Sequence, residues 1–318
     1  MKKNVLITAL CLFLSCSGIV ASQPFHHSQR HIKRVIYFTL DGVRWQDVFL
    51  DHARFPIFWQ KYAERTAIYG APDSATTMEV ASIPISLPSY QSQMSGQVQP
   101  CRENECGRIT VTTFPEALIQ KYKWQKKDVA SISSWEVTDH AVESVEGTIF
   151  NNNGTRPMTD PDTHQPDDVM IDLNRQQAEH YPGDDTRLDK YTFAQALHYL
   201  EKYQPKFLWI SFGDADDYAH EGKLQAYRDA LAYSDMAIDQ LMTMLKKMNI
   251  DEETMVIVTT DHGRGNGDNW VDHGEELPES KQTWAFVING ELEAGVKEGN
   301  IMHFSTLSIR PTVEKIFS

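Results

Sequence analysis

The sequence predicts an α/β fold with a doubly wound, mostly parallel central sheet and helices on both faces of that sheet. The first observation is a series of strand-length runs that are apolar almost throughout, at residues 34–40, 129–133, 207–212, 255–260 and 284–289. Such runs are typical of strands that are covered on both faces. The second observation is that segments with apolar residues at helical spacing, 191–203 and 224–248, lie between these runs.

Polar residues follow three of the predicted strands. They are Asp41 after the first run, Asp214 and Asp216 after the third, and Asp261 with His262 after the fourth. In doubly wound sheets the ligand site forms beyond the carboxyl ends of the strands. We therefore expect these side chains to meet in one polar site, because solubility alone does not explain three polar strand ends.

Residues 1–22 have the pattern of a bacterial-type secretory signal peptide. Lys2 and Lys3 precede an apolar run at 5–14, and small residues extend to Ser22. A membrane anchor and a lipoprotein processed before Cys16 are the alternatives, but the apolar run is short for a membrane span. We therefore expect a periplasmic or secreted protein with no stable membrane insertion after cleavage.

The rest of the chain predicts one domain. Residues 23–33 are polar and predict a flexible leader, and residues 34–318 have the length of a single α/β domain. Within that domain, the irregular and polar stretch near 140–190 predicts a lid or insertion over the site.

The charge and the cysteines limit the partners. A net charge of −14 disfavours nucleic acid as a bulk partner but remains compatible with a small phosphorylated substrate. Cys101 and Cys106 remain after removal of the signal, and in an exported protein their spacing predicts a disulfide. No second thiol pair exists that would complete a metal site with them. The sequence contains no signal for the oligomeric state.

Ser86 begins a segment with helix signals. Pro88 suits the first turn of a helix and Gly96 suits its end, so a plain capping serine is one interpretation. A hydroxyl at a helix N-terminus also faces free N–H groups and the positive end of the helix dipole, where a phosphoryl group is stabilised. A bound metal would make such a serine nucleophilic.

Further ligand candidates lie in the second half of the chain. Asp216 and His220 are four residues apart, a spacing that brings both side chains to one side of a helix start. Asp214 and Asp217 are rival ligands, and a solvated acidic loop is the alternative interpretation. His273 supplies another imidazole.

The order of these residues resembles that of the alkaline phosphatase superfamily, especially its nucleotide pyrophosphatase/phosphodiesterase-like and sulfatase-like branches. The resemblance covers residues 34–316 and consists of an Asp after the first strand, a nucleophile at a helix start, Asp-x-x-x-His, Asp-His-Gly and a last His. It implies two metal sites, one formed by Asp41, Ser86, Asp261 and His262, the other by Asp216, His220 and His273. Mixed carboxylate and imidazole ligands suit Zn, with Mn as the alternative.

The resemblance implies an exported two-metal hydrolase of phosphomonoesters or phosphodiesters. Ser86 would attack phosphorus in line and form a phosphoserine that water then hydrolyses. Arg264 and either Asn152 or Asn153 are candidate contacts to the phosphoryl oxygens, with a surface or structural salt bridge as the alternative for Arg264. Candidates for the pocket wall, with core packing as the alternative, are the aromatic residues Trp45, Tyr90, Trp135 and Trp270.

Departures from the family pattern narrow the function. A sulfatase needs an Arg four residues after the nucleophile, where this chain has Tyr90, and the Ser-Glu-Val-Gly-His-type segment of cofactor-independent phosphoglycerate mutases is absent. Diesterases of the superfamily often have Thr as nucleophile and Asn three residues on. This chain has Ser86 and Ser89 there, so the choice between monoester and diester stays open. The alternatives are a sulfate or phosphonate ester hydrolase of the same superfamily, or a non-catalytic secreted metal-binding protein.

Overall fold

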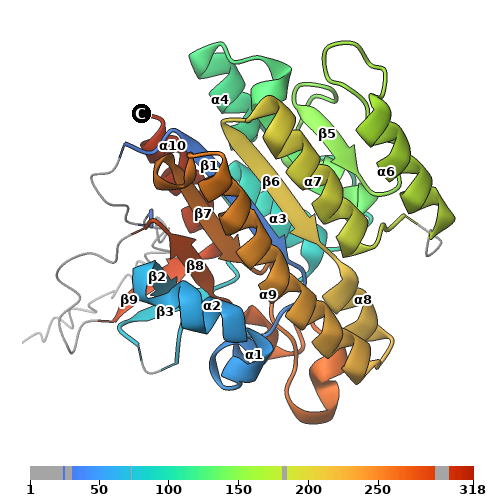
Figure 1. Ribbon diagram of the computed structural model, residues 1–318. Coiled ribbons are helices and arrows are strands. Elements are labelled where there is room, and N and C mark those ends of the chain that lie inside the picture. Colours follow the sequence, from blue (N-terminus) through green and yellow to red (C-terminus); the bar gives the residue numbers. More distant parts are fainter. Residues whose placement is uncertain (1–23, 26–30, 73, 181–184, 291–300) are drawn as a thin grey trace, which may run out of the picture.

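A mostly parallel sheet forms the centre of the protein (Figure 1). The structure is a computed structural model that describes residues 24–25, 31–72, 74–180, 185–290 and 301–318. The strands within these residues are β1 (Arg34–Leu40), β2 (Thr66–Tyr69), β3 (Thr76–Glu79), β4 (Val129–Ser133), β5 (Phe150–Asn153), β6 (Phe207–Phe212), β7 (Thr254–Thr259), β8 (Ala285–Ile288) and β9 (Met302–Ser305). In the described part of the chain the main sheet has seven strands in the order β2-β8-β7-β1-β6-β4-β5, and β3 pairs with β9 in a second sheet.

The direction of the strands confirms the predicted fold class. β7, β1, β6, β4 and β5 run parallel to one another, and β8 is antiparallel to both β7 and β2. The predicted strands at 34–40, 129–133 and 207–212 have the observed bounds, while those at 255–260 and 284–289 differ from β7 and β8 by one residue at their ends.

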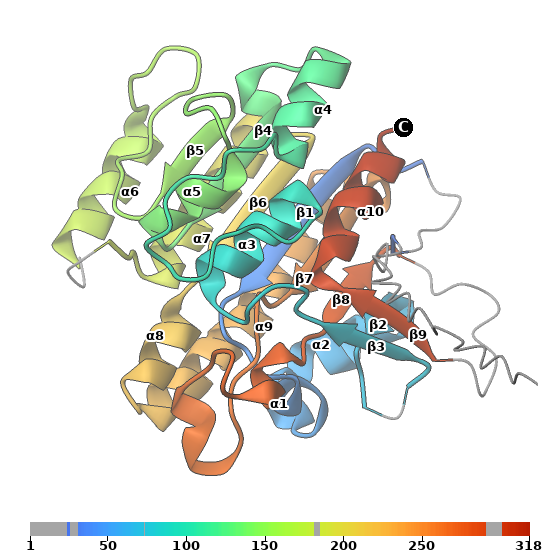
Figure 2. The ribbon, with the colours of Figure 1, turned by 180° about the vertical axis from the view of Figure 1, so that it is seen from behind.

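Helices cover both faces of the main sheet. They are α1 (Trp45–Phe49), α2 (Pro56–Lys61), α3 (Ser86–Ser95), α4 (Phe114–Tyr122), α5 (Asp139–Val142), α6 (Asp168–Glu179), α7 (Asp189–Tyr203), α8 (Asp214–His220), α9 (Leu224–Lys247) and α10 (Ile309–Ile316). Figure 1 shows α2, α7 and α9 in front of the sheet, and Figure 2 shows α3, α4 and α10 on the other face. None of the helices in the described residues is both long enough and apolar enough to cross a membrane.

Strand β1 shows why both faces must be covered. All of its residues are buried. Ile36, Phe38 and Leu40 belong to the apolar core on the α9 face, and Val35 and Tyr37 belong to the core on the α3 face. Successive side chains of a strand point to opposite faces, so a strand with apolar side chains on both faces needs a helical layer on each side.

The predicted leader at 23–33 is wrong in part, because two of its residues are buried. Phe25 is fully buried, and its ring centroid lies 4.4 Å from that of Tyr69. Its backbone N–H donates to Oγ1 of Thr312 at 2.7 Å. Ile32 is buried as well. The predicted signal peptide, residues 1–22, lies outside the described residues.

The stretch near 140–190 also differs from the expected lid. Most of it completes the fold, since β5 is the last strand of the main sheet and α6 packs on α7. Residues 185–188 do line the cavity described below.

Candidate active site

The candidate site lies beyond the carboxyl ends of three adjacent strands. β1 lies between β7 and β6, Asp41 directly follows β1, and Asp261 comes two residues after the end of β7. Helix α8, which contains Asp216, follows β6. Parallel strands in this order bring residues from distant parts of the sequence to one edge of the sheet.

The first group of potential ligands consists of Asp41, Asp261 and His262, whose ligand atoms all lie within 4.8 Å of one another. Ser86 adjoins this group. Its Oγ lies 3.3 Å from Oδ1 of Asp41 and 3.2 Å from Nε2 of His262. All four residues are buried. The structure therefore brings together the four residues that the sequence predicted as one site.

The second group consists of Asp216, His220 and His273, again with ligand atoms within 4.8 Å of one another. Nε2 of His220 lies 3.3 Å from Oδ2 of Asp216 and 3.0 Å from Nε2 of His273. Neither of the two rival acids belongs to this group. Oδ1 of Asp214 accepts a hydrogen bond from the backbone of Asp189 at 3.2 Å.

The protonation of both groups fits a divalent cation in each. Nδ1 of His262 lies 2.9 Å from the carbonyl oxygen of Gly263, and Nδ1 of His273 lies 2.8 Å from that of Pro84. A carbonyl only accepts, so each Nδ1 carries the proton and each Nε2 directs a lone pair at its ligand group. Oδ2 of Asp261 is buried without a hydrogen-bond partner. A divalent cation in each group would satisfy the acceptors that face one another there.

The electrostatics of the site support the same conclusion. Burial lowers the pKa of His262 to about 3 and that of His273 to about 2, so both rings are neutral and able to act as ligands. Burial, together with the charge of Asp261, raises the pKa of Asp41 well above its usual value, and burial raises the pKa of Asp261 to about 6. Two such carboxylates are stable as anions side by side only if a positive charge compensates them.

Helix α3 directs Ser86 at the first group. Ser86 is the first residue of α3 and not its cap, since Ile85 is the N-cap and no side chain caps this end. The hydroxyl is therefore available for chemistry. Two hydrogen bonds fix the position of this helix relative to the first group. The hydroxyl of Tyr90 donates to Oδ2 of Asp41 at 3.0 Å, and Oγ of Ser89 donates to the carbonyl of Asp261 at 2.7 Å.

Arg264 orients the second group and does not contact the cavity, which corrects the expectation that it binds substrate. Its fully buried guanidinium donates to the carboxylate of Asp216, to the carbonyl of Val271 at 2.8 Å and to that of Gly42 at 3.2 Å. The structural salt bridge is therefore the correct alternative. The φ of Gly42 is +63°, and a Cβ there would collide with the Asp216 carboxylate.

The prediction of Asn153 as a substrate contact is wrong. Its side chain is buried and hydrogen-bonded within the protein, and it does not line the cavity. It is fully buried, donates to Oδ1 of Asp139 at 2.9 Å and accepts from Oγ of Ser131 at 3.1 Å. Asn152 is also buried, and its Oδ1 accepts from Arg187 at 3.0 Å. Both belong to β5, which β6 and β4 separate from β1.

Asn104 is a cavity residue that the sequence analysis missed. Its Oδ1 accepts a hydrogen bond from the backbone N–H of Leu87, the residue after Ser86, at 3.0 Å. The amide oxygen of Asn104 accepts this bond, so both N–H donors on its Nδ2 stay available for another partner. Asn104 lies between Cys101 and Cys106, which form the predicted disulfide. The two cysteines mark this loop in the sequence, but nothing in their spacing indicates that Asn104 lines a cavity.

A cavity of about 480 Å³ opens beside both ligand groups. The site residues among its lining are Asp41, Ser86, Asp216, His220 and His273. The rest of its wall is formed by Asn104, Trp135, Asp185, Thr186, Arg187, Leu188, Gly213, Asp214, Asp217, Tyr218 and Glu221. Of the four aromatic candidates, Trp135 alone is among the described residues that line the cavity.

Comparison with known families identifies the chain. Residues 112–312, more than half of the sequence, match the family model described as type I phosphodiesterase / nucleotide pyrophosphatase. The chain belongs to this family. The type I phosphodiesterase family places the protein in the alkaline phosphatase superfamily and makes it a hydrolytic enzyme, as the sequence predicted. A search of the curated proteins found no match.

Solved structures share the fold at low sequence identity. The phosphonate monoester hydrolase of Agrobacterium radiobacter aligns with a TM-score of 0.59 and 12% identity, over 90% of this chain and 74% of that one. A protein in the alkaline phosphatase superfamily from Vibrio parahaemolyticus aligns with a TM-score of 0.57 and 13% identity, over 92% and 67% of the two chains. A TAB5 alkaline phosphatase mutant with bound Mg aligns with a TM-score of 0.53 and 11% identity, over 91% and 99%.

Proposed function

We propose that this type I phosphodiesterase family member is an exported two-metal hydrolase of phosphoric esters that acts through a phosphoserine. The observation that supports this most is the position of the Ser86 hydroxyl. It is free of any capping role, lies 3.2 Å from Nε2 of His262 and 3.3 Å from Oδ1 of Asp41, and borders the cavity.

Two divalent cations, which we propose to be Zn, would supply positive charge for the phosphoryl oxygens and for the departing oxygen. Asp41, Ser86, Asp261 and His262 would hold one, and Asp216, His220 and His273 the other. Neutral imidazoles combined with carboxylates favour Zn, and Mn is the alternative.

Ser86 and Asn104 would carry the chemistry of this chain. Ser86 Oγ forms the new bond to phosphorus as the ester oxygen leaves, and the hydroxyl proton departs with the alcohol product. A water molecule then hydrolyses the phosphoserine and restores the hydroxyl. Nδ2 of Asn104 supplies donors for a phosphoryl oxygen, because its own Oδ1 is already bound to Leu87.

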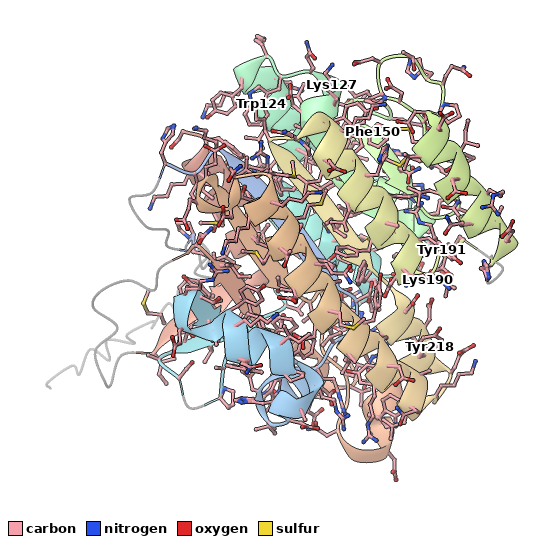
Figure 3. The ribbon with its side chains drawn as sticks, in the orientation of Figure 1. Trp124, Lys127, Phe150, Lys190, Tyr191 and Tyr218 are labelled. Atoms are coloured by element: carbon pink, nitrogen blue, oxygen red, sulfur yellow. A yellow bond between two sulfur atoms is a disulfide. The ribbon has the colours of Figure 1, made fainter. Side chains whose placement is uncertain are left out.

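The cavity wall favours leaving groups without negative charge. Four carboxylates that belong to neither ligand group line it, namely Asp185, Asp214, Asp217 and Glu221. The guanidinium of Arg187, the sole Lys or Arg side chain among the described lining residues, donates to acceptors within the protein. Lys190, at the start of α7, and Tyr218 of α8 lie toward the same side of the molecule (Figure 3). The charge of Lys190 acts on Asp214, but Lys190 does not line the cavity. We therefore propose a preference for neutral or cationic esters over polyanionic nucleotides.

Export is part of the proposal. The signal-like residues 1–22 and the disulfide between Cys101 and Cys106 support a periplasmic or secreted location, because disulfides persist in oxidising compartments.

The test is a hydrolysis panel that compares the wild type with Ser86→Ala. The substrates are p-nitrophenyl phosphate, bis-p-nitrophenyl phosphate, p-nitrophenyl phosphorylcholine, a p-nitrophenyl nucleotide ester, p-nitrophenyl phenylphosphonate and a sulfate ester. We expect Ser86→Ala to lose at least about a thousandfold in kcat. Ser92→Ala, a change of a buried serine within the same helix, is the matched control and should retain activity.

Chelation is the second arm of this experiment. Dialysis against EDTA should abolish hydrolysis, and Zn or Mn should restore it. Mass spectrometry of the active protein should find about two metal ions per chain. An active Ser86→Ala variant would refute the nucleophile, and a dominant sulfatase activity would refute the phosphate ester as substrate.

A further inference from the structure

The loop between Cys101 and Cys106 forms part of the cavity wall beside the nucleophile. The disulfide closes this loop at both ends, with Asn104 between the cysteines. Asn104 lines the cavity together with Ser86, and its Oδ1 accepts from the N–H of Leu87 at 3.0 Å. One hydrogen bond thus joins the tip of the loop to the first turn of α3.

The flanks of the loop contact the same two elements that carry the site. Nε2 of Gln91, one turn further along α3, donates to the carbonyl of Gly107 at 2.7 Å. On the other side, Arg102 forms an ion pair with Glu275 at 2.7 Å, two residues after the ligand His273. Both side chains of this ion pair are exposed, so it contributes little to the position of the loop.

Little else fixes the loop. Arg102, Glu103, Glu105 and Cys106 are exposed, and Cys101 is the sole buried residue from 101 to 106. A packed apolar core is therefore missing within this loop, and the disulfide is its main restraint. The stabilisation of a whole fold by a disulfide grows with the length of the closed loop, and this loop is short. Its effect is thus expected to be local.

We propose that the Cys101–Cys106 disulfide is a positioning element that holds the carboxamide of Asn104 against the phosphoryl site. This inference rests on the proposed function, since it assigns the disulfide to the same phosphoryl-transfer site. Its consequence is that full activity develops only after the disulfide has formed. The enzyme is then weakly active as a reduced chain and fully active in an oxidising compartment.

The test is a double-mutant cycle between the disulfide and the side chain that it positions. The variants are Cys101→Ser with Cys106→Ser, Asn104→Ala, and the combination of all three, assayed as purified, metal-loaded full chains on the best ester of the panel. We expect Asn104→Ala to lower kcat about a hundredfold, as for the loss of one donor to a developing oxyanion. The double cysteine variant should lose about tenfold in kcat, because Asn104 then occupies its position only part of the time.

The decisive result is the combination. If the disulfide acts through Asn104, its removal changes activity less than about twofold once Asn104 is alanine. Effects that multiply instead would overturn the proposal, as would a double cysteine variant with wild-type kinetics. A double cysteine variant that does not fold would also overturn it, since the disulfide would then support the whole fold.

Two controls separate a local role from a general loss of stability. Arg102→Ala, in the same loop, should leave kcat and KM unchanged. Asn104→Asp keeps an oxygen for Leu87 but loses both donors, so it should be as impaired as Asn104→Ala while its Tm and metal content stay at wild-type values. Failure of the proposed function shows separately, because an active Ser86→Ala variant refutes the hydrolase mechanism whatever the loop does.

Discussion

Asp189 is expected to control metal binding although it is not a ligand. It is 1% exposed, and its carboxylate accepts from Oγ of Ser134 at 2.6 Å and from the backbone N–H groups of Gly213 and Asp214 at 2.8 and 3.2 Å. These last two groups form the start of α8, the helix that carries Asp216 and His220. Replacing Asp189 by Ala removes the acceptor that holds this helix end.

The expected loss of stability follows from the hydrogen-bond donors that lose their acceptor. Each buried donor without a partner costs about 1–3 kcal/mol, and water from the adjacent cavity would satisfy part of them, so we expect about 3 kcal/mol of lost stability. Mutation of a residue that supports metal ligands without binding the metal typically lowers metal affinity by about 10–100-fold. Asp189→Ala should therefore weaken the second metal site by that factor, with the first site less affected.

Asp235 provides a matched control, since it also caps a helix from a buried position. It is 1% exposed and accepts from the N–H groups of Ile57 and Phe58 at 2.7 and 2.8 Å, at the start of α2. Asp235→Ala should lower the free energy of unfolding by a similar amount and leave metal binding intact. The assay is competition for Zn with a chromogenic chelator, alongside urea denaturation. Equal metal affinity in the two variants would refute the reasoning.

Two further predictions concern stability away from the site. Phe25→Ala should lose about 3–5 kcal/mol in the free energy of unfolding, measured by urea denaturation, because the fully buried ring would leave a cavity against Tyr69; an unchanged free energy would mean that this segment is a loose leader after all. Glu116 accepts from the N–H groups of Thr113, Ser144 and Val145. Burial alone would raise the pKa of Glu116, but these hydrogen bonds outweigh it and lower the pKa below 4.5. Its stabilisation is therefore present above about pH 4.5 and lost as the pH falls through the lowered pKa. Glu116→Gln should be less stable at neutral pH and lose less stability on acidification, as followed by denaturation at a series of pH values; parallel pH profiles for the two proteins would contradict this.

The fold was predictable where local pattern and burial agree. β1, β4 and β6 are mostly apolar and buried throughout, and their bounds were predicted to the residue. β5 was not predicted because its sequence, Phe-Asn-Asn-Asn, is polar and reads as a turn. It becomes a strand because its backbone pairs with β4 and because Arg187 and Asp139 bind its amide side chains.

The two groups of candidate ligands were predictable for a different reason. Asp and His directly after an apolar strand indicate a site by their placement, and topology then determines which strand ends meet. Asn104 and Arg264 show the limit of that reasoning. A polar side chain can line a cavity or can hold a candidate ligand in place, and contacts with residues distant in sequence decide between the two. Asn104 is held by Leu87, and Arg264 binds Asp216.

The central position of β1 has a consequence for the order in which the protein is made. β1 is synthesised first, yet its hydrogen-bonding partners are β6 and β7, as in the pairs Val35 with Phe207 and Arg34 with Thr254. The middle of the sheet therefore stays open until most of the chain has emerged, and long-range pairing of this kind is slow. The site beyond the carboxyl end of β1 therefore cannot assemble until β6 and β7 have been made and have paired with β1.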